Sequence, residues 1–170
     1  MGHYITDCPI VPDPEMDLKQ MPETFWMAKE RVLGMLAGVG INEEISIGLK
    51  QFTGDQRCWL AMYMRDSQFR GNPIFFVNTQ TPGIIDAAVL PQKITVEDVM
   101  IDSLIHEYFH VVEEWGRRKN REMYNLIYGP FSDEEDFAEY GVDFLRYHKN
   151  RSSRKTVVEK VIKLYVRDVF

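Results

Sequence analysis

Residues 101–112 read Ile101-Asp102-Ser103-Leu104-Ile105-His106-Glu107-Tyr108-Phe109-His110-Val111-Val112, and the predictions for fold and chemistry both start here. The stretch contains the pattern His-Glu-x-x-His. On an α-helix, residues four apart lie on one face, one turn from each other, so His106 and His110 can reach a single tetrahedral zinc ion. Glu107 lies beside them, where it can take a proton from a metal-activated water without binding the metal itself.

The surrounding residues predict a helix that is buried nearly all round. Between positions 104 and 112, every residue outside the motif is uncharged. We expect the helix to begin at Thr95, where Asp98 completes an N-terminal capping signal, and to end near Trp115-Gly116. Burying two histidines and a glutamate without partners would be costly, and a metal ion would remove that cost. The alternative is an accidental motif whose histidines form ordinary hydrogen bonds in the core.

A catalytic zinc site also needs a third protein ligand and an open position for water. No further histidine follows the motif at short range. Residues 133–139 read DEEDFAE and form an acidic cluster within a second helix, predicted over residues 132–147. A carboxylate from this helix could complete a ligand set of two histidines and one glutamate.

The segment Glu135-Asp136-Phe137-Ala138-Glu139-Tyr140 resembles the Asn-Glu-Gly-Phe-Ala-x-Tyr segment of gluzincin aminopeptidases, which are zincin-type metallopeptidases. This resemblance implies that Glu135 is the third zinc ligand and that Ala138 lies where two helices pack closely. Glu135 follows His110 by 25 residues. That spacing is closer to small one-domain HExxH proteins of phage and bacterial genomes, which resemble the ImmA/IrrE group.

Four acidic residues compete for the ligand position, and the sequence leaves the choice open. With Glu135 as the ligand, Glu139 lies one turn later and is placed to orient His106 by accepting a hydrogen bond. Alternatively, Glu139 is the ligand and Asp143 takes the orienting role by the same spacing. Glu134 has its own claim because it lies on the predicted apolar face of the helix, and Asp133 is the fourth candidate.

Elsewhere, strand-like patterns come first and helical patterns follow. Strands are predicted at residues 44–51, 57–64 and 73–78, and further helices at 22–36 and 155–167. We therefore expect an α+β fold over residues 1–170, a single zincin-like domain with an irregular N-terminal arm at residues 1–20. A twisted, mostly antiparallel sheet would pack on the HExxH helix, and the second helix would bring the third ligand. By resemblance to zincins, Phe75–Asn78 is the expected edge strand for an extended peptide.

Composition narrows the partners and the compartment. The formal net charge of −6 favours neither nucleic acid nor an anionic membrane surface. No apolar run is long enough to span a membrane, and the N-terminus lacks the pattern of a signal peptide. Cys8 and Cys58 are far apart and form no zinc-binding pair. We expect a cytoplasmic protein, with its oligomeric state left open.

These observations predict a zinc-dependent peptidase with His106, His110 and Glu135 as ligands, Glu107 as general base, and a peptide or protein as substrate. Tyr124, Tyr128 and His148 follow the motif and are weak candidates for stabilising the oxyanion in the transition state. Two other functions stay open. One is a metal-binding zincin that acts as a sensor or effector, or cuts a single partner. The other is a structural protein with an accidental HExxH.

Overall fold

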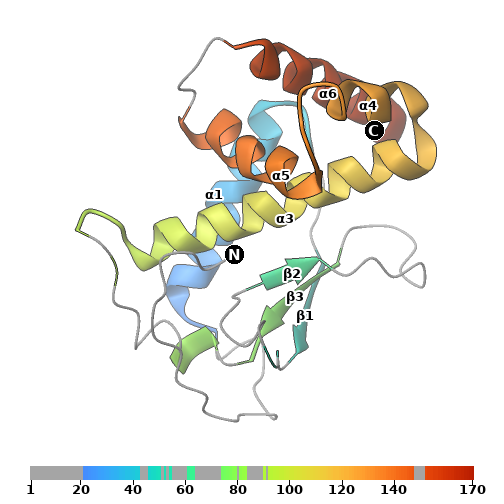
Figure 1. The fold of residues 1–170 in the computed structure, drawn as a ribbon. Helices are drawn as coiled ribbons and strands as arrows, with labels where there is room; N and C mark the ends of the chain where they lie inside the picture. Colours follow the sequence, from blue (N-terminus) through green and yellow to red (C-terminus); the bar gives the residue numbers. More distant parts are fainter. Residues whose placement is uncertain are drawn as a thin grey trace. The chain divides into compact units, whose positions relative to one another are not determined.

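The computed structural model of the chain describes residues 21–42, 46–50, 52, 54, 61–63, 74–79, 81–83, 90, 92–147 and 152–170. The predicted N-terminal arm, both cysteines and His148 lie outside these residues. The principal helices are α1 (Glu23–Gly38), α3 (Val96–Lys119), α4 (Arg121–Ile127), α5 (Glu134–Val142) and α6 (Ser153–Val169) (Figure 1). A π-helical turn, η3 (Asp143–Tyr147), continues directly from α5.

Three short strands form one sheet: β1 (Ser46–Lys50), β2 (Ala61–Tyr63) and β3 (Ile74–Asn78), in the order β1-β3-β2. β3 pairs with β1 in parallel over five residue pairs and with β2 antiparallel over three. The prediction of Phe75–Asn78 as an edge strand is therefore wrong, because β3 lies between its two neighbours. Apolar and aromatic residues, alternating with polar ones only in the first strand, indicate where these strands lie, but they carry no information about which strands pair or in which direction.

The predicted α+β fold class is also wrong. Helices account for 77% of the residues whose side-chain environment the structure describes. The sheet is small, and most of its residue pairs are parallel, so it is not the twisted, mostly antiparallel layer that we expected. The described part of the chain is a mainly helical fold. The sequence prediction gave three short strands the same weight as four long helices. Strands of three to five residues contribute much less to a fold than helices of up to 24 residues.

The chain divides into two compact units. Residues Met1–Val32 and Glu44–Leu104 form unit 1, and residues Leu33–Glu43 and Ile105–Phe170 form unit 2. Helix α3 runs from the first unit into the second, and all three residues of its HExxH motif belong to unit 2. The single zincin-like domain over residues 1–170 stays a prediction.

The start of α3 confirms the predicted capping signal. The Thr95 backbone N–H and its hydroxyl donate to the Asp98 carboxylate at 3.1 and 2.8 Å. In return, the Asp98 N–H donates to the Thr95 hydroxyl at 3.1 Å. This reciprocal arrangement satisfies N–H groups that the first turn of a helix leaves without partners.

In unit 2, helices α3, α5 and α6 share an aromatic and aliphatic core. Tyr108 of α3 is fully buried and its hydroxyl lies 3.2 Å from that of Tyr165 in α6. Phe109 of α3 packs edge-on against Phe137 of α5, with ring centroids 5.6 Å apart. Tyr108 and Phe109 lie between the two motif histidines in the sequence, so α5 and α6 hold α3 at residues within the HExxH motif itself. None of the helices in the described residues combines the length and apolarity needed to cross a membrane.

Candidate metal centre

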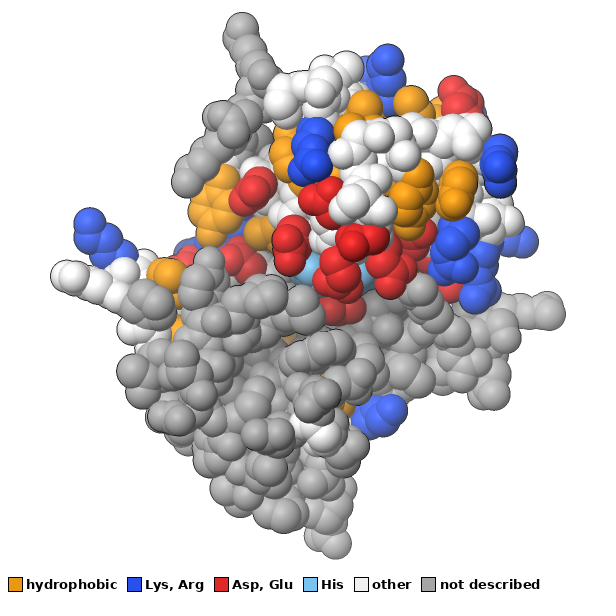
Figure 2. All heavy atoms as spheres, in the orientation of Figure 1, with side chains coloured by type: hydrophobic (Ala, Val, Ile, Leu, Met, Phe, Trp, Pro, Cys, Tyr) orange, Lys and Arg blue, Asp and Glu red, His pale blue; other side chains and the backbone are white. Residues whose placement is uncertain are grey.

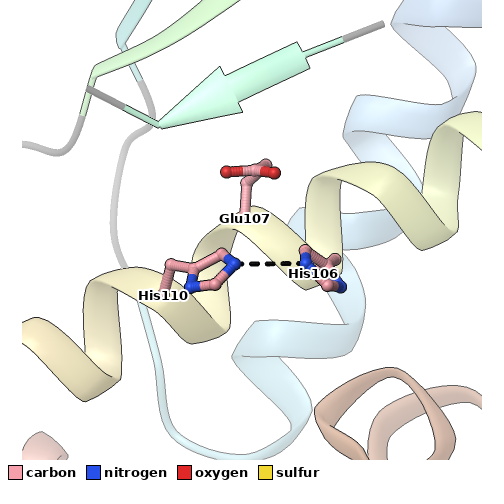
Figure 3. A group of neighbouring side chains, drawn as sticks. All are labelled: His106, Glu107 and His110. Carbon is pink, nitrogen blue, oxygen red and sulfur yellow. Dashed lines mark hydrogen bonds between the residues drawn. The ribbon is translucent and has the colours of Figure 1, made fainter. Parts of the chain in front are cut away.

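His106 and His110 lie one turn apart on α3, as their spacing predicts, and a ring nitrogen of each points toward the other (Figure 3). Their Nε2 atoms are 3.1 Å apart, and the ring centroids are 4.8 Å apart. Both side chains are almost completely buried, with exposed fractions of 4% and 8%. Two imidazole nitrogens therefore converge on one point beside the buried face of α3.

Glu135, in the first turn of α5, brings its carboxylate to the same point. One oxygen, Oε2, lies 3.0 Å from His106 Nε2, and the other, Oε1, lies 3.0 Å from His110 Nε2. The favoured third ligand thus meets both histidines in space, although 25 residues separate it from His110 in the sequence. Its competitors Asp133, the N-cap of α5, and Glu139 are exposed, and Glu135 itself is about half exposed, with an exposed side-chain fraction of 48%.

The distances between these atoms fit a small divalent cation. Ligand atoms around a tetrahedral zinc with bonds of 2.0–2.1 Å are separated by about 3.3 Å. Here the two Nε2 atoms are 3.1 Å apart and each is 3.0 Å from one of the two Glu135 oxygens, slightly shorter than that. Neutral imidazoles and a carboxylate are also the donors that zinc prefers. A shared proton bridges only two of these atoms, whereas one cation could bind both imidazoles and the carboxylate.

Glu107 projects from α3 beside the two imidazoles without lying between them (Figure 3). It is buried, and its carboxylate lies within 4.8 Å of a ring nitrogen of each histidine. A group in this position is close enough to exchange a proton with a water held at the histidines. Its placement is consistent with the role of a general base.

A second cluster joins Glu134 to His110 and Glu135, with potential ligand atoms within 4.8 Å of one another. Burial raises the pKa of Glu135, and the nearby carboxylates of Glu134 and Glu139 raise it further. Figure 2 shows acidic side chains gathered around the exposed edge of the histidines. The site is therefore rich in negative charge, and a bound cation would relieve that repulsion. The proposed contact from Glu139 to His106 stays a prediction.

Two features place α5 so that Glu135 reaches the histidines. Asp133 caps the helix, accepting the Asp136 backbone N–H at 2.7 Å. At the other end, Gly141 lies directly over the Phe109 ring, so closely that a Cβ would overlap it. The resemblance had pointed to Ala138 as the close-packing residue. Ala138 is fully buried, but it is Gly141 whose missing side chain makes room for α3.

Tyr128, one candidate for oxyanion stabilisation, donates its hydroxyl to Glu113 Oε1 at 2.7 Å. Burial is the main reason that the pKa of Tyr128 is raised, followed by this hydrogen bond and by the charges of Glu113 and Glu134. Tyr124 packs against Tyr128, with ring centroids 4.8 Å apart. Tyr128 is therefore near the acidic cluster, while its hydroxyl is engaged by a buried carboxylate that sequence reasoning had not singled out.

In comparisons with known proteins, no family model, no curated protein and no solved structure matches this chain. The likeness to gluzincins and to small ImmA/IrrE-like proteins therefore rests on the two motifs alone.

Proposed function

We propose that this protein is a zinc-dependent peptidase whose metal is held by His106, His110 and Glu135. The observation that carries the proposal is that side chains from two helices meet at one place: the two histidine Nε2 atoms lie 3.1 Å apart, and each lies 3.0 Å from a different oxygen of the Glu135 carboxylate. A bound cation would pair with the carboxylate and offset the cost of burying the polar imidazoles beside it.

A bound zinc ion would polarise the substrate carbonyl and lower the pKa of a water molecule at the site. Glu107 would accept the proton of that water and later return it to the leaving amine. Because Glu107 is buried beside the histidines, its carboxylate is held in place and shielded from bulk solvent. The acidic residues around the site would help to retain a divalent cation.

The substrate in this proposal is a peptide or protein, and neither nucleic acid nor a membrane is a proposed partner. The net charge of −6 supports this choice, since it would repel polyanions. We propose the cytoplasm as the compartment, which the two widely spaced cysteines favour over an oxidising one.

The first test is elemental analysis of protein purified without a histidine tag and without added metal. We expect about one zinc per chain, and the double variant His106→Ala/His110→Ala should lose it. Protein that holds no metal, and whose melting temperature does not change with added zinc, would refute the proposal and leave an accidental motif.

A peptide library then distinguishes the remaining functions. A peptidase should cleave some members of an unbiased library, and a chelator should abolish that cleavage. A protein that binds zinc tightly but cleaves none of the library would instead be a metal-binding zincin that acts as a sensor or effector, or on a single partner.

A further inference from the structure

Arg154, in the first turn of α6, contacts the segment that leads into α5 and the first turn of that helix. Its guanidinium donates to both oxygens of the Asp136 carboxylate, from Nη1 at 3.3 Å and from Nη2 at 3.2 Å. Nη2 also donates to the backbone carbonyl of Pro130 at 3.1 Å. The same guanidinium lies over the Phe131 ring, 4.8 Å from its centroid. A planar, forked donor can make all these contacts at once, which a lysine ammonium cannot.

The partner of Arg154 holds the start of α5 in place. Asp136 Oδ2 accepts the backbone N–H of Ser132 at 3.0 Å and its hydroxyl at 3.2 Å. The Asp136 N–H in turn donates to the cap residue Asp133. One carboxylate therefore ties the residue before the cap, the first turn of α5 and the start of α6 together. Hydrogen bonds from Ser132 and the charge of Arg154 lower the pKa of Asp136, so it stays ionised.

Glu135, the favoured metal ligand, is the residue immediately before Asp136 in this turn. Consecutive residues on a helix point about 100° apart, so Glu135 can face the histidines while Asp136 faces Arg154. A ligand in the first turn would otherwise belong to the part of a helix that frays most readily. The far end of α6 is fixed to α3 as well, through the contact between Tyr108 and Tyr165.

We propose that Arg154 is a positioning residue for the metal site: it acts through Asp136 to hold Glu135 against His106 and His110. This inference rests on the proposed function, because it assumes that Glu135 binds a metal. The hydrogen bonds of Arg154 go to Asp136 and Pro130, neither of which is a proposed ligand. Its effect on the metal should therefore pass entirely through the carboxylate ligand.

The experiment measures zinc affinity by competition with a chromophoric chelator for the full chain and its variants. We expect Arg154→Ala to weaken zinc about tenfold or more, in the range typical of residues that support a ligand. Arg154→Lys should recover part of that loss, since it restores the charge but not the fork. The matched control is Arg167→Ala, which removes another exposed arginine–aspartate pair at the far end of α6 and should leave the affinity unchanged.

A double-variant comparison separates positioning from a general loss of structure. In a Glu135→Ala background, Arg154→Ala should cause no further loss of zinc affinity, because the ligand through which it acts is gone. Circular dichroism of each metal-free variant checks that it is folded at the temperature of the titration.

An unchanged affinity in folded Arg154→Ala would overturn the inference, as would an equally large loss in the Glu135→Ala background. Either result leaves the proposed function standing, provided that the parent protein binds zinc. A parent protein that binds no zinc overturns both.

Discussion

Gly141 of α5 lies flat against the ring of Phe109 of α3, at a distance where any Cβ would overlap the ring carbons. Phe109 is the neighbour of His110 in the sequence, and Gly141 is on the helix that carries Glu135. The separation of the two ligand-bearing helices is therefore set, at this contact, by the absence of a single methyl group. An imidazole and a carboxylate 3.0 Å apart leave little tolerance for a shift between their helices.

We expect Gly141→Ala to lower the free energy of unfolding and to weaken zinc binding. Overpacking of a core costs about 1–3 kcal/mol, and the better helix propensity of alanine offsets only about 1 kcal/mol of it. Urea denaturation of metal-free protein and a zinc titration measure the two effects.

Gly34→Ala is the matched control for this change. Gly34 lies within α1, and a Cβ there would meet nothing within 4 Å. It should leave zinc affinity unchanged and make the protein slightly more stable. If Gly141→Ala behaved like Gly34→Ala, the close packing would have no role in the site.

The three glutamates of α5 should differ in their effect on the metal. Glu135→Ala should cause the largest loss of zinc affinity, because its two oxygens contact both histidines. Glu139→Ala should cause an intermediate loss if it orients His106, and Glu134→Ala only a small one. The proximity of Glu134 to His110 makes this last comparison the most informative. Isothermal titration of each variant with zinc gives the order, and a larger loss for Glu134→Ala would move the third ligand to that residue.

The helical half of the chain was largely predictable because its signals are local. The HExxH spacing, the Thr95–Asp98 cap and the apolar periodicity all act within a few turns, and the structure has helices where these patterns place them. The short helix α4 was missed, and its cap at Asn120, which accepts the Met123 N–H, is the signal that could have revealed it.

Contacts between segments that are distant in the sequence could not be predicted from it. Strand order in the small sheet depends on which backbones meet, and the parallel pairing of β1 with β3 has no local signature. Likewise, nothing in residues 133–139 indicates that Arg154 holds their first turn, or that Gly141 lies against Phe109 of α3. These are properties of packing, and they fix the geometry of a site whose ligands the motifs only nominate.

Asp168, near the C-terminal end of α6, should make the stability of the protein depend on pH. Its Oδ2 accepts hydrogen bonds from Asn120 Nδ2 at 2.6 Å and from Trp115 Nε1 at 3.2 Å. The bond from Asn120 is the main cause that lowers the pKa of Asp168 below its usual value of 3.8. A carboxyl whose pKa is lowered by folding stabilises the native state above its unfolded pKa, and that contribution disappears as the pH falls through the folded value.

The parent should therefore be more stable than Asp168→Asn at pH 6. The difference should begin to shrink below about pH 4, where the carboxyl of the unfolded chain is protonated, and should disappear as the pH falls through the lowered pKa of the folded state. Urea denaturation at both pH values measures it. A difference that stays constant or grows on acidification would show that the charge of Asp168 does not contribute.

The last prediction separates metal binding from catalysis at Glu107. Glutamine has nearly the same shape as glutamate but cannot accept a proton at neutral pH, so Glu107→Gln should remain folded and keep its zinc. Loss of a general base should reduce peptide cleavage by at least roughly a hundredfold. Glu114→Gln is the matched control, because Glu114 is another buried glutamate of α3, about one turn beyond the motif and paired with Arg118 at 3.0 Å. It should cleave the same library peptide at close to the parent rate. If Glu107→Gln also cleaves that peptide at the parent rate, Glu107 is not the base. If instead Glu107→Gln loses zinc, Glu107 is a metal ligand rather than the general base.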